Sequence, residues 1–168
     1  MKIEPQSSTE LIDLGKRVEG INIVMMTTLD ADGALGSRPM SPVQMDEKGA
    51  IWFFTDLRSE KIEHLRVVNV AFSDEGNATY VSISGRGEIH AERAHIEKLW
   101  TPFLRPWFPD GPDSTNLALL KFVPETAEYW DAPNSKMVRM FAMAASIVAS
   151  KPIGMGEHDT LTDLALAQ

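Results

Sequence analysis

The spacing of apolar residues along this chain changes from a helical period to a strand period near residue 20. Four apolar residues recur at helical spacing before that point: Leu11, Ile12, Leu14 and Val18. The stretch 7–10 offers serine, threonine and glutamate as capping groups in front of them. Further along, β-branched and aromatic runs alternate with turns rich in Gly, Asp and Asn. The pattern predicts a short leading helix followed by antiparallel strands.

Seven strand segments are predicted after this helix. They cover residues 21–29, 34–45, 51–54, 67–73, 79–89, 116–123 and 126–130. Both faces of the first segment carry apolar residues, so we expect both to be largely covered. Two prolines in the second predict an open or irregular edge, and Gly85 with Gly87 predicts a bulge where a barrel closes. Because no strand-helix-strand alternation is present, we predict a mainly β (α+β) barrel with flanking helices.

Helical patterns interrupt this series and follow it. We predict a short helix that begins at Ser59 and turns Ile62 and Leu65 toward the sheet, a second helix at 92–100, and a final helix capped at 133–135. The proline-rich segment 101–115 is predicted to be an irregular loop. Residues 1–150 then form one domain, and 151–168 is expected to be a mobile tail.

Composition limits the classes of function. A chain of 168 residues is long enough to bury a core, and the absence of cysteine excludes disulfides and thiolate metal sites and favours a cytoplasmic location. The net charge of −8 argues against binding to nucleic acid or to anionic lipid. No apolar stretch approaches the roughly 20 residues of a transmembrane helix, and the N-terminal stretch has no signal-peptide pattern. We therefore expect a soluble protein without nucleic-acid or membrane partners.

The stretch 51–62 is the strongest candidate for a binding site. A buried-type strand, 51–54, runs into a turn with Thr55, Ser59 and Lys61, and a helix is predicted to start there. Helix starts expose backbone N–H groups and a partial positive charge, so a hydroxyl and a cation at such a point suit a phosphate. The alternative is an ordinary strand, turn and capped surface helix. Arg38 beside the irregular edge of 34–45 is a second candidate, where a ligand can bind the backbone, and the alternative there is an ordinary bulged edge strand.

Two further motifs are weaker. Gly85-Arg86-Gly87 lacks the third glycine and the strand-turn-helix context of a dinucleotide fingerprint. His90, Glu92 and His95 have a spacing that crosses a predicted strand-helix boundary, so we interpret the histidines as solvated and predict no metal site. Nor does a general base or nucleophile stand out, and we predict no catalytic residue.

Taken together, the ordered motifs resemble the flavin-binding split-barrel superfamily named for pyridoxine phosphate oxidase. They are Arg38 to Val43 (RPMSPV), Ile51 to Asp56 (IWFFTD) and Ser59 with Lys61, while Glu128 to Asp131 (EYWD) and the overall size resemble its bacterial general stress protein branch. The resemblance covers about residues 8 to 150. It implies a six-stranded antiparallel split β-barrel with flanking helices. It also implies a homodimer that binds flavin mononucleotide (FMN) in clefts at the subunit interface, with flavin adenine dinucleotide (FAD) as an alternative.

Carried over by position, the resemblance assigns roles to residues of this chain. Ser59 and Lys61 correspond to the phosphate contacts. The contacts along the flavin ring and ribityl chain correspond to Arg38, Pro39, Met40, Phe54 and Thr55. Apart from the resemblance, Trp107 on the proline-rich loop and Trp130 are candidates for lining the cleft or for contacting the partner subunit, and packing under the loop is the simpler alternative for Trp107.

Two departures from the oxidase narrow the function. Glu60 stands where the oxidase commonly has a further arginine, which weakens the positive charge at the phosphate. The end of the chain contains no arginine after Arg139, so the cations that hold pyridoxal phosphate in the oxidase are missing. We predict a flavin-binding general stress protein with flavin-based oxidoreductase activity, if any, and not a pyridoxine phosphate oxidase. The alternatives are a flavin- or deazaflavin-dependent reductase of a small planar acceptor, or a cofactor-free dimeric scaffold.

Overall fold

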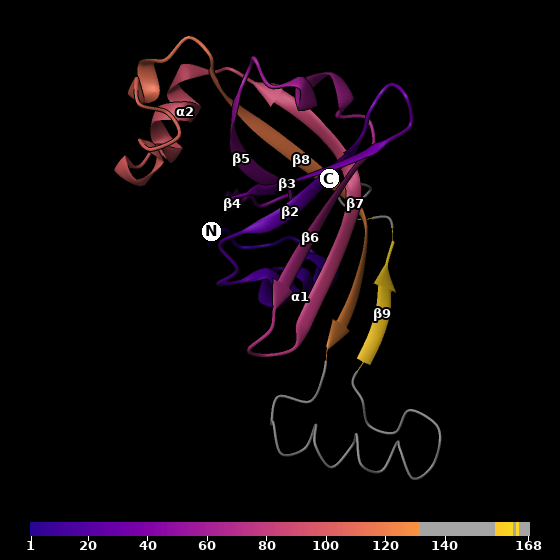
Figure 1. Cartoon of the computed structure of the whole chain (residues 1–168). Helices are drawn as coiled ribbons and strands as arrows, with labels where there is room; N and C mark the ends of the chain where they lie inside the picture. The colour runs from indigo at the N-terminus through magenta and orange to yellow at the C-terminus, as the bar shows by residue number, and fades with distance from the viewer. Residues whose placement is uncertain (132–156, 163, 165–168) are drawn as a thin grey trace, which may run out of the picture.

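The framework of the protein is one strongly curled sheet, seen in a computed structural model that describes residues 1–131, 157–162 and 164 (Figure 1). Nine strands belong to this described part: β1 (Lys2–Ile3), β2 (Val24–Leu29), β3 (Leu35–Met40), β4 (Pro42–Met45), β5 (Ile51–Asp56), β6 (Val68–Asp74), β7 (Thr79–His90), β8 (Leu117–Asp131) and β9 (Glu157–Leu161). Hydrogen bonds join them in the order β1-β4-β5-β8-β7-β6-β2-β3, and β9 pairs with β8. The pairing of β1 with β4 is parallel, and the other pairings are antiparallel.

The barrel is closed by the chain itself. β3 pairs with β2 and β4 pairs with β5, although only Ser41 separates β3 from β4. The predicted single strand 34–45 is therefore divided, and its two halves join opposite ends of the sheet. Pro39 and Pro42 flank the break, where a residue without an N–H loses no ladder bond. Counted with 34–45 as one strand and without the edge strands β1 and β9, the sheet has the six strands of the predicted split barrel.

The main core fills the inside of this barrel. α1 (Thr9–Val18) begins at Ser8, whose Oγ accepts a hydrogen bond of 3.3 Å from the N–H of Leu11. Leu11 and Leu14 of α1 are fully buried and pack in one cluster with Phe53 of β5. Ile12, predicted on the same helix face, is instead 43 % exposed, because at helical spacing it lies a quarter turn away from Leu11.

A second apolar cluster lies on the outer face of β5. Successive side chains of a strand point to opposite faces, so Phe53 enters the barrel while Trp52 and Phe54 face outward. α2 (Arg93–Leu99) covers them with Ile96. The loop that follows contains two short 3₁₀ turns, η2 (Pro102–Leu104) and η3 (Gly111–Asp113), as expected for an irregular segment.

Several local predictions differ from the structure. The helix predicted from Ser59 is a single 3₁₀ segment, η1 (Glu60–His64). The outer face of β2 is not covered within one chain, since Met25 is 42 % exposed. The segments predicted at 116–123 and 126–130 are one strand, β8, that continues through Pro124. His95 is not simply solvated, because its ring packs edge-on against buried Trp52 at 4.4 Å.

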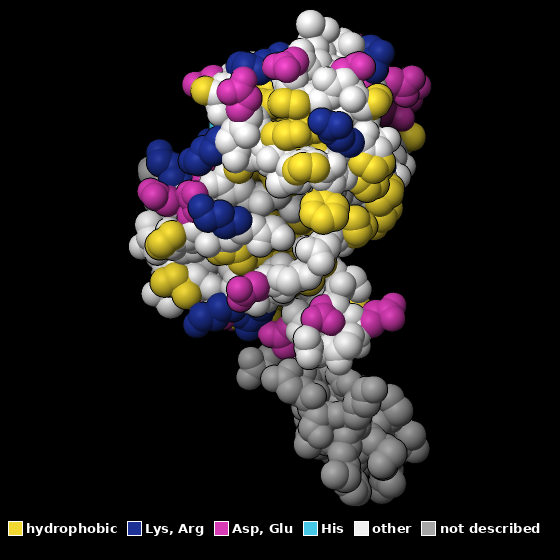
Figure 2. All heavy atoms as spheres, turned by 90° about the vertical axis from the view of Figure 1, so that its left-hand side faces the viewer, with side chains coloured by type: hydrophobic (Ala, Val, Ile, Leu, Met, Phe, Trp, Pro, Cys, Tyr) yellow, Lys and Arg dark blue, Asp and Glu magenta, His cyan; other side chains and the backbone are white. Residues whose placement is uncertain are grey.

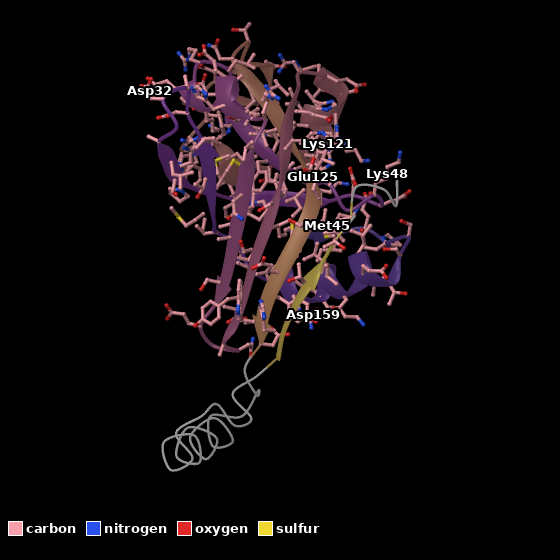
Figure 3. All side chains as sticks on the ribbon, turned by 90° about the vertical axis from the view of Figure 1, so that its right-hand side faces the viewer. Asp32, Met45, Lys48, Lys121, Glu125 and Asp159 are labelled. Atoms are coloured by element: carbon pink, nitrogen blue, oxygen red, sulfur yellow. The ribbon has the colours of Figure 1, made fainter. Side chains whose placement is uncertain are left out.

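The expected tail, 151–168, contains a strand. β9 pairs with the far half of β8, where Tyr129 stands opposite Asp159 (Figure 3). His158 stacks on Trp130 at a ring distance of 5.0 Å, which holds the two strands together in addition to their ladder. The predicted final helix, capped at 133–135, falls outside the described residues. Within those residues, no helix is both long enough and apolar enough to cross a membrane.

The predicted bulge at Gly85 yields a test of the barrel. The register between β7 and β8 shifts between Ser84 and Gly85, and a Cβ at Gly85 would clash with the carbonyl oxygen of Val123. We expect Gly85→Ala to lower the free energy of unfolding by about 1–3 kcal/mol, measured by urea denaturation. Gly15→Ala is the control, because a Cβ there meets only ordinary contacts at 3.4 Å and alanine favours a helix. Equal effects of the two substitutions would contradict this account.

Candidate functional site

Lys61 is buried at the start of η1, although lysine is seldom buried. Only 9 % of its surface is exposed, and its Nζ donates a hydrogen bond of 3.1 Å to the Oγ of Ser59. Ser59 therefore occupies the N-cap position without capping the helix through its side chain. The hydroxyl and the ammonium group instead form a pair at the turn that leaves β5.

Arg38 contributes a second cation from β3. Alternation along this strand places Gly36, Arg38 and Met40 on the half-buried face, while Pro39 is exposed on the other face. The guanidinium donates from Nη1 to Thr28 Oγ1 at 3.1 Å and from Nη2 to the carbonyl oxygen of Gly36 at 3.4 Å. Since η1 lies next to β2, which also carries Thr28, the two cations approach each other at one end of the barrel.

The charges around Lys61 leave the site electropositive. Burial lowers the pKa of Lys61, the charge of Arg38 lowers it further, and Asp56 acts in the opposite direction. Asp56 is engaged by Arg58, which donates from Nε and Nη2 to its two carboxylate oxygens and from its backbone N–H. These hydrogen bonds lower the pKa of Asp56 to about 2. Among the described residues, no carboxylate lies within 4.0 Å of the charged nitrogens of Lys61 or Arg38.

Thr55 adds a buried hydroxyl without a partner. Its Oγ1 makes no hydrogen bond, and alternation along β5 places it on the same face as Phe53. An unsatisfied buried hydroxyl costs about 1–3 kcal/mol, so such a group suggests a ligand. The turn that follows joins Thr55 to the Ser59 and Lys61 pair, and the Ser59 N–H closes it on the Asp56 carbonyl at 3.0 Å. Two cations and two hydroxyls are the donors that a phosphate group requires.

The remaining predicted contacts are dispersed. Met40 is half-buried and packs against the main core. Phe54 lies on the opposite face of β5 from Thr55, with its ring edge-on to Trp100 at 5.8 Å and tilted against Phe108 at 6.3 Å. The structure therefore brings Arg38, Thr55, Ser59 and Lys61 to one region, but it does not bring the side chain of Phe54 there.

Of the two candidate tryptophans, Trp130 lies far from this region within one chain, whereas Trp107 is on a loop whose Phe108 packs against Phe54. Trp107 is 73 % exposed on the loop after α2. Figure 2 views the molecule from the side on which α2 lies and shows hydrophobic side chains gathered on the upper part of this face. Thr55 pairs with Ala118 at one end of β8, and Trp130 is 12 residues further along that strand (130 − 118 = 12). At about 3.3 Å per residue this is roughly 40 Å. A single subunit cannot place Trp130 beside Lys61.

Sequence reasoning missed several side chains of interest. Thr28 is a polar residue among apolar inward positions of β2, and that interruption was a usable signal. Trp52 is flanked by His90 and His95, and its indole N–H donates to Asp46 at 2.8 Å. Lys121, labelled in Figure 3, has its Nζ 5.8 Å from the centroid of the Trp52 ring. A surface hollow lined by 20–23 and 73–75 contains none of the predicted site residues.

Comparisons with known proteins agree with this architecture. The chain is similar to a putative general stress protein 26 from Jannaschia sp. CCS1, with 26 % identity, a TM-score of 0.70, and coverage of 90 % of this chain and 99 % of the other. It is also similar to the general stress FMN/FAD binding protein of Xanthomonas citri, with 33 % identity, a TM-score of 0.62, and coverage of 77 % and 92 %. Protein bli-3 of Neurospora crassa is 26 % identical over 153 residues, which are 83 % of this chain and 73 % of bli-3.

Residues 9–153 match the family described as "Pyridoxamine 5'-phosphate oxidase like". This match spans α1 and the described strands β2 to β8, and so includes the four donor residues Arg38, Thr55, Ser59 and Lys61. The split barrel and its general stress protein 26 neighbours lead to the same assignment. The chain belongs to the pyridoxamine 5'-phosphate oxidase-like family, within which its structural neighbours are general stress proteins of the split-barrel fold.

Proposed function

We propose that this protein binds a flavin, with FMN as the cofactor and its phosphate held by Lys61, Arg38, Ser59 and Thr55. The observation that carries the proposal is the pair of cations, one of them buried, beside a buried hydroxyl that lacks a partner. The relative from Xanthomonas citri, named as an FMN/FAD binding protein, supports a flavin as the ligand. When bound, the flavin ring would supply electron or hydride transfer, so an oxidoreductase activity would be that of the cofactor.

The charge of the site favours FMN over FAD. A phosphate monoester carries about −1.5 to −2 charges at neutral pH, which two cations can balance. Each phosphate of FAD belongs to a pyrophosphate, with one ester bond, one anhydride bond and one charge, so a single FAD phosphate would leave the pair of Lys61 and Arg38 with excess positive charge. The hydroxyls of Ser59 and Thr55 would donate to phosphate oxygens, which gives Thr55 the partner that it lacks in the free protein.

We further propose that two copies of the chain form the complete cleft. The outer face of β2 and β3 exposes apolar side chains without charges among them, including Met25 and Leu35. Pro39 lies on this same face, next to Arg38. Because Trp130 is roughly 40 Å from Thr55 along β8, it can reach the flavin only from the partner subunit. Burial of this apolar face between two subunits would both stabilise the dimer and complete the pocket for the flavin ring.

The direct test is flavin binding by purified protein. We expect the protein to quench the fluorescence of added FMN, and Lys61→Met and Arg38→Met each to weaken binding by about 10- to 150-fold, since a charge-assisted hydrogen bond contributes about 1.5–3 kcal/mol. Lys16→Met, a change of an exposed lysine on α1, is the control and should bind normally. Wild-type protein that neither carries a flavin absorption spectrum nor quenches FMN would refute the proposal.

The burial of Lys61 predicts a stability cost in the free protein. Its folded-state pKa lies below the ordinary 10.5, so the folded state holds the proton less tightly than the unfolded state does. We expect Lys61→Met to raise the Tm of flavin-free protein at neutral pH, where each gain of about 1 kcal/mol would appear as roughly 2–4 °C in a domain of this size. The difference should disappear as pH rises through the window between the folded pKa and 10.5. A lower Tm for the variant at neutral pH would contradict this explanation.

The proposed interface predicts that Met25→Glu produces a monomer. A charge introduced on the apolar face would have to be buried without a partner, which opposes association. We expect light scattering to show a dimer for the wild type and a monomer for the variant, together with weaker FMN binding. Ile12→Glu introduces the same charge at a position of nearly equal exposure on α1, outside the sheet face, and should remain dimeric. A wild-type monomer that binds FMN fully would exclude the shared cleft.

A further inference from the structure

The guanidinium of Arg38 is held by two groups before any ligand is present. Thr28 Oγ1 accepts from Nη1 and the Gly36 carbonyl oxygen accepts from Nη2, so each terminal nitrogen has its own acceptor. Thr28 stands directly opposite Gly36 across the β2-β3 pair, one diagonal step from Arg38. Because Thr28 is only 2 % exposed, its hydroxyl cannot exchange freely with bulk water.

Gly36 leaves the space in which this guanidinium lies. A Cβ at Gly36 would be 2.9 Å from Nη2 of Arg38, a distance that real Cβ atoms essentially never show. Gly36 is not among the glycines with positive φ, so its backbone conformation does not call for glycine. An alanine at this position would therefore require the guanidinium of Arg38 to shift.

The Thr28 hydroxyl, the Gly36 carbonyl oxygen and the space at Gly36 form a cradle for the guanidinium. Without this cradle, two effects would favour a position of the Arg38 side chain outside the site. Its positive charge repels that of Lys61 and lowers the pKa of Lys61. In addition, an arginine side chain that is free in solvent gains rotamer entropy. Two acceptors from rigid strands offset both tendencies. They hold the second cation beside the first at the point where a phosphate would arrive, and the cost of ordering it is met during folding.

We infer that Thr28, with Gly36, is a positioning residue that aims Arg38 and thereby makes the site select a phosphate monoester over an uncharged flavin. This inference rests on the proposed function for the identity of the ligand. Thr28 touches Arg38 and has no direct role in holding the flavin. Its removal should therefore affect the phosphate contribution to binding and leave the ring contribution intact.

The test compares the Kd values of FMN and riboflavin, which differ only in the phosphate. We expect Thr28→Val, which keeps the shape and removes the hydroxyl, to weaken FMN binding about 10-fold and to leave riboflavin binding unchanged, so that the FMN to riboflavin ratio falls about 10-fold. Thr28→Ser should restore the ratio. Thr9→Val is the control, because it removes the same hydroxyl from an exposed threonine at the start of α1, away from β2 and β3. An unchanged ratio, or equal losses for both flavins, would overturn the inference.

Gly36→Ala provides a second variant that leaves the hydroxyl of Thr28 in place. It should displace the guanidinium and lower the same ratio, even if Thr28→Val does not fold. Inorganic phosphate separates this inference from the proposed function. If phosphate raises the Tm of the wild type but of neither variant, the cradle is supported even where no flavin binds. The failure of flavin to bind would then refute only the proposed function. Equal phosphate shifts in wild type and variants, or no shift in the wild type, would overturn the cradle itself.

Discussion

The buried charge of Lys61 is the constraint on which the rest of the site depends. Moving an ammonium group out of water is unfavourable unless an opposite charge or several acceptors compensate it. Here Lys61 donates to the Ser59 hydroxyl, Asp56 acts on it only at longer range and is itself bound by Arg58, and Arg38 adds a like charge. The free protein thus keeps an uncompensated cation in place, which is the arrangement that an anionic ligand would stabilise.

The fold explains how two cations so far apart in the chain come together. Because β3 and β4 are consecutive yet lie at opposite ends of the hydrogen-bonded path, the sheet must curl until β2 and β5 approach the same end of the barrel. β2 and β3 then carry Thr28 and Arg38, while β5 leads through a short turn to Ser59 and Lys61. Because the chain changes partner strands at Ser41, the barrel closes there, and β3 is left with a free edge next to Arg38.

Local patterns were sufficient to predict the strands, the first helix and the cation turn, because each depends on residues close in sequence. The bulge at Gly85 and the meeting of Ser59 with Lys61 at the turn after β5 were predicted in this way. The division of 34–45, the orientation of Phe54 and the pairing of β9 depend on contacts between distant segments, which a periodic pattern does not specify. Thr28 could have been noticed as a hydroxyl among Val24 and Met26, but its link to Arg38 required the register of β2 and β3.

Glu60 illustrates how placement decides the effect of a charge. In sequence it directly precedes Lys61 and replaces a cation of the oxidase, which suggested a weakened phosphate site. In the structure Glu60 is exposed while Lys61 is buried, because neighbouring residues of a 3₁₀ turn point about a third of a turn apart. Water and salt screen an exposed carboxylate, whereas the interaction between Lys61 and a phosphate would be formed away from solvent. Glu60 should therefore slow the approach of an anion more than it weakens the bound state, and the same holds for the net charge of −8 on the whole chain.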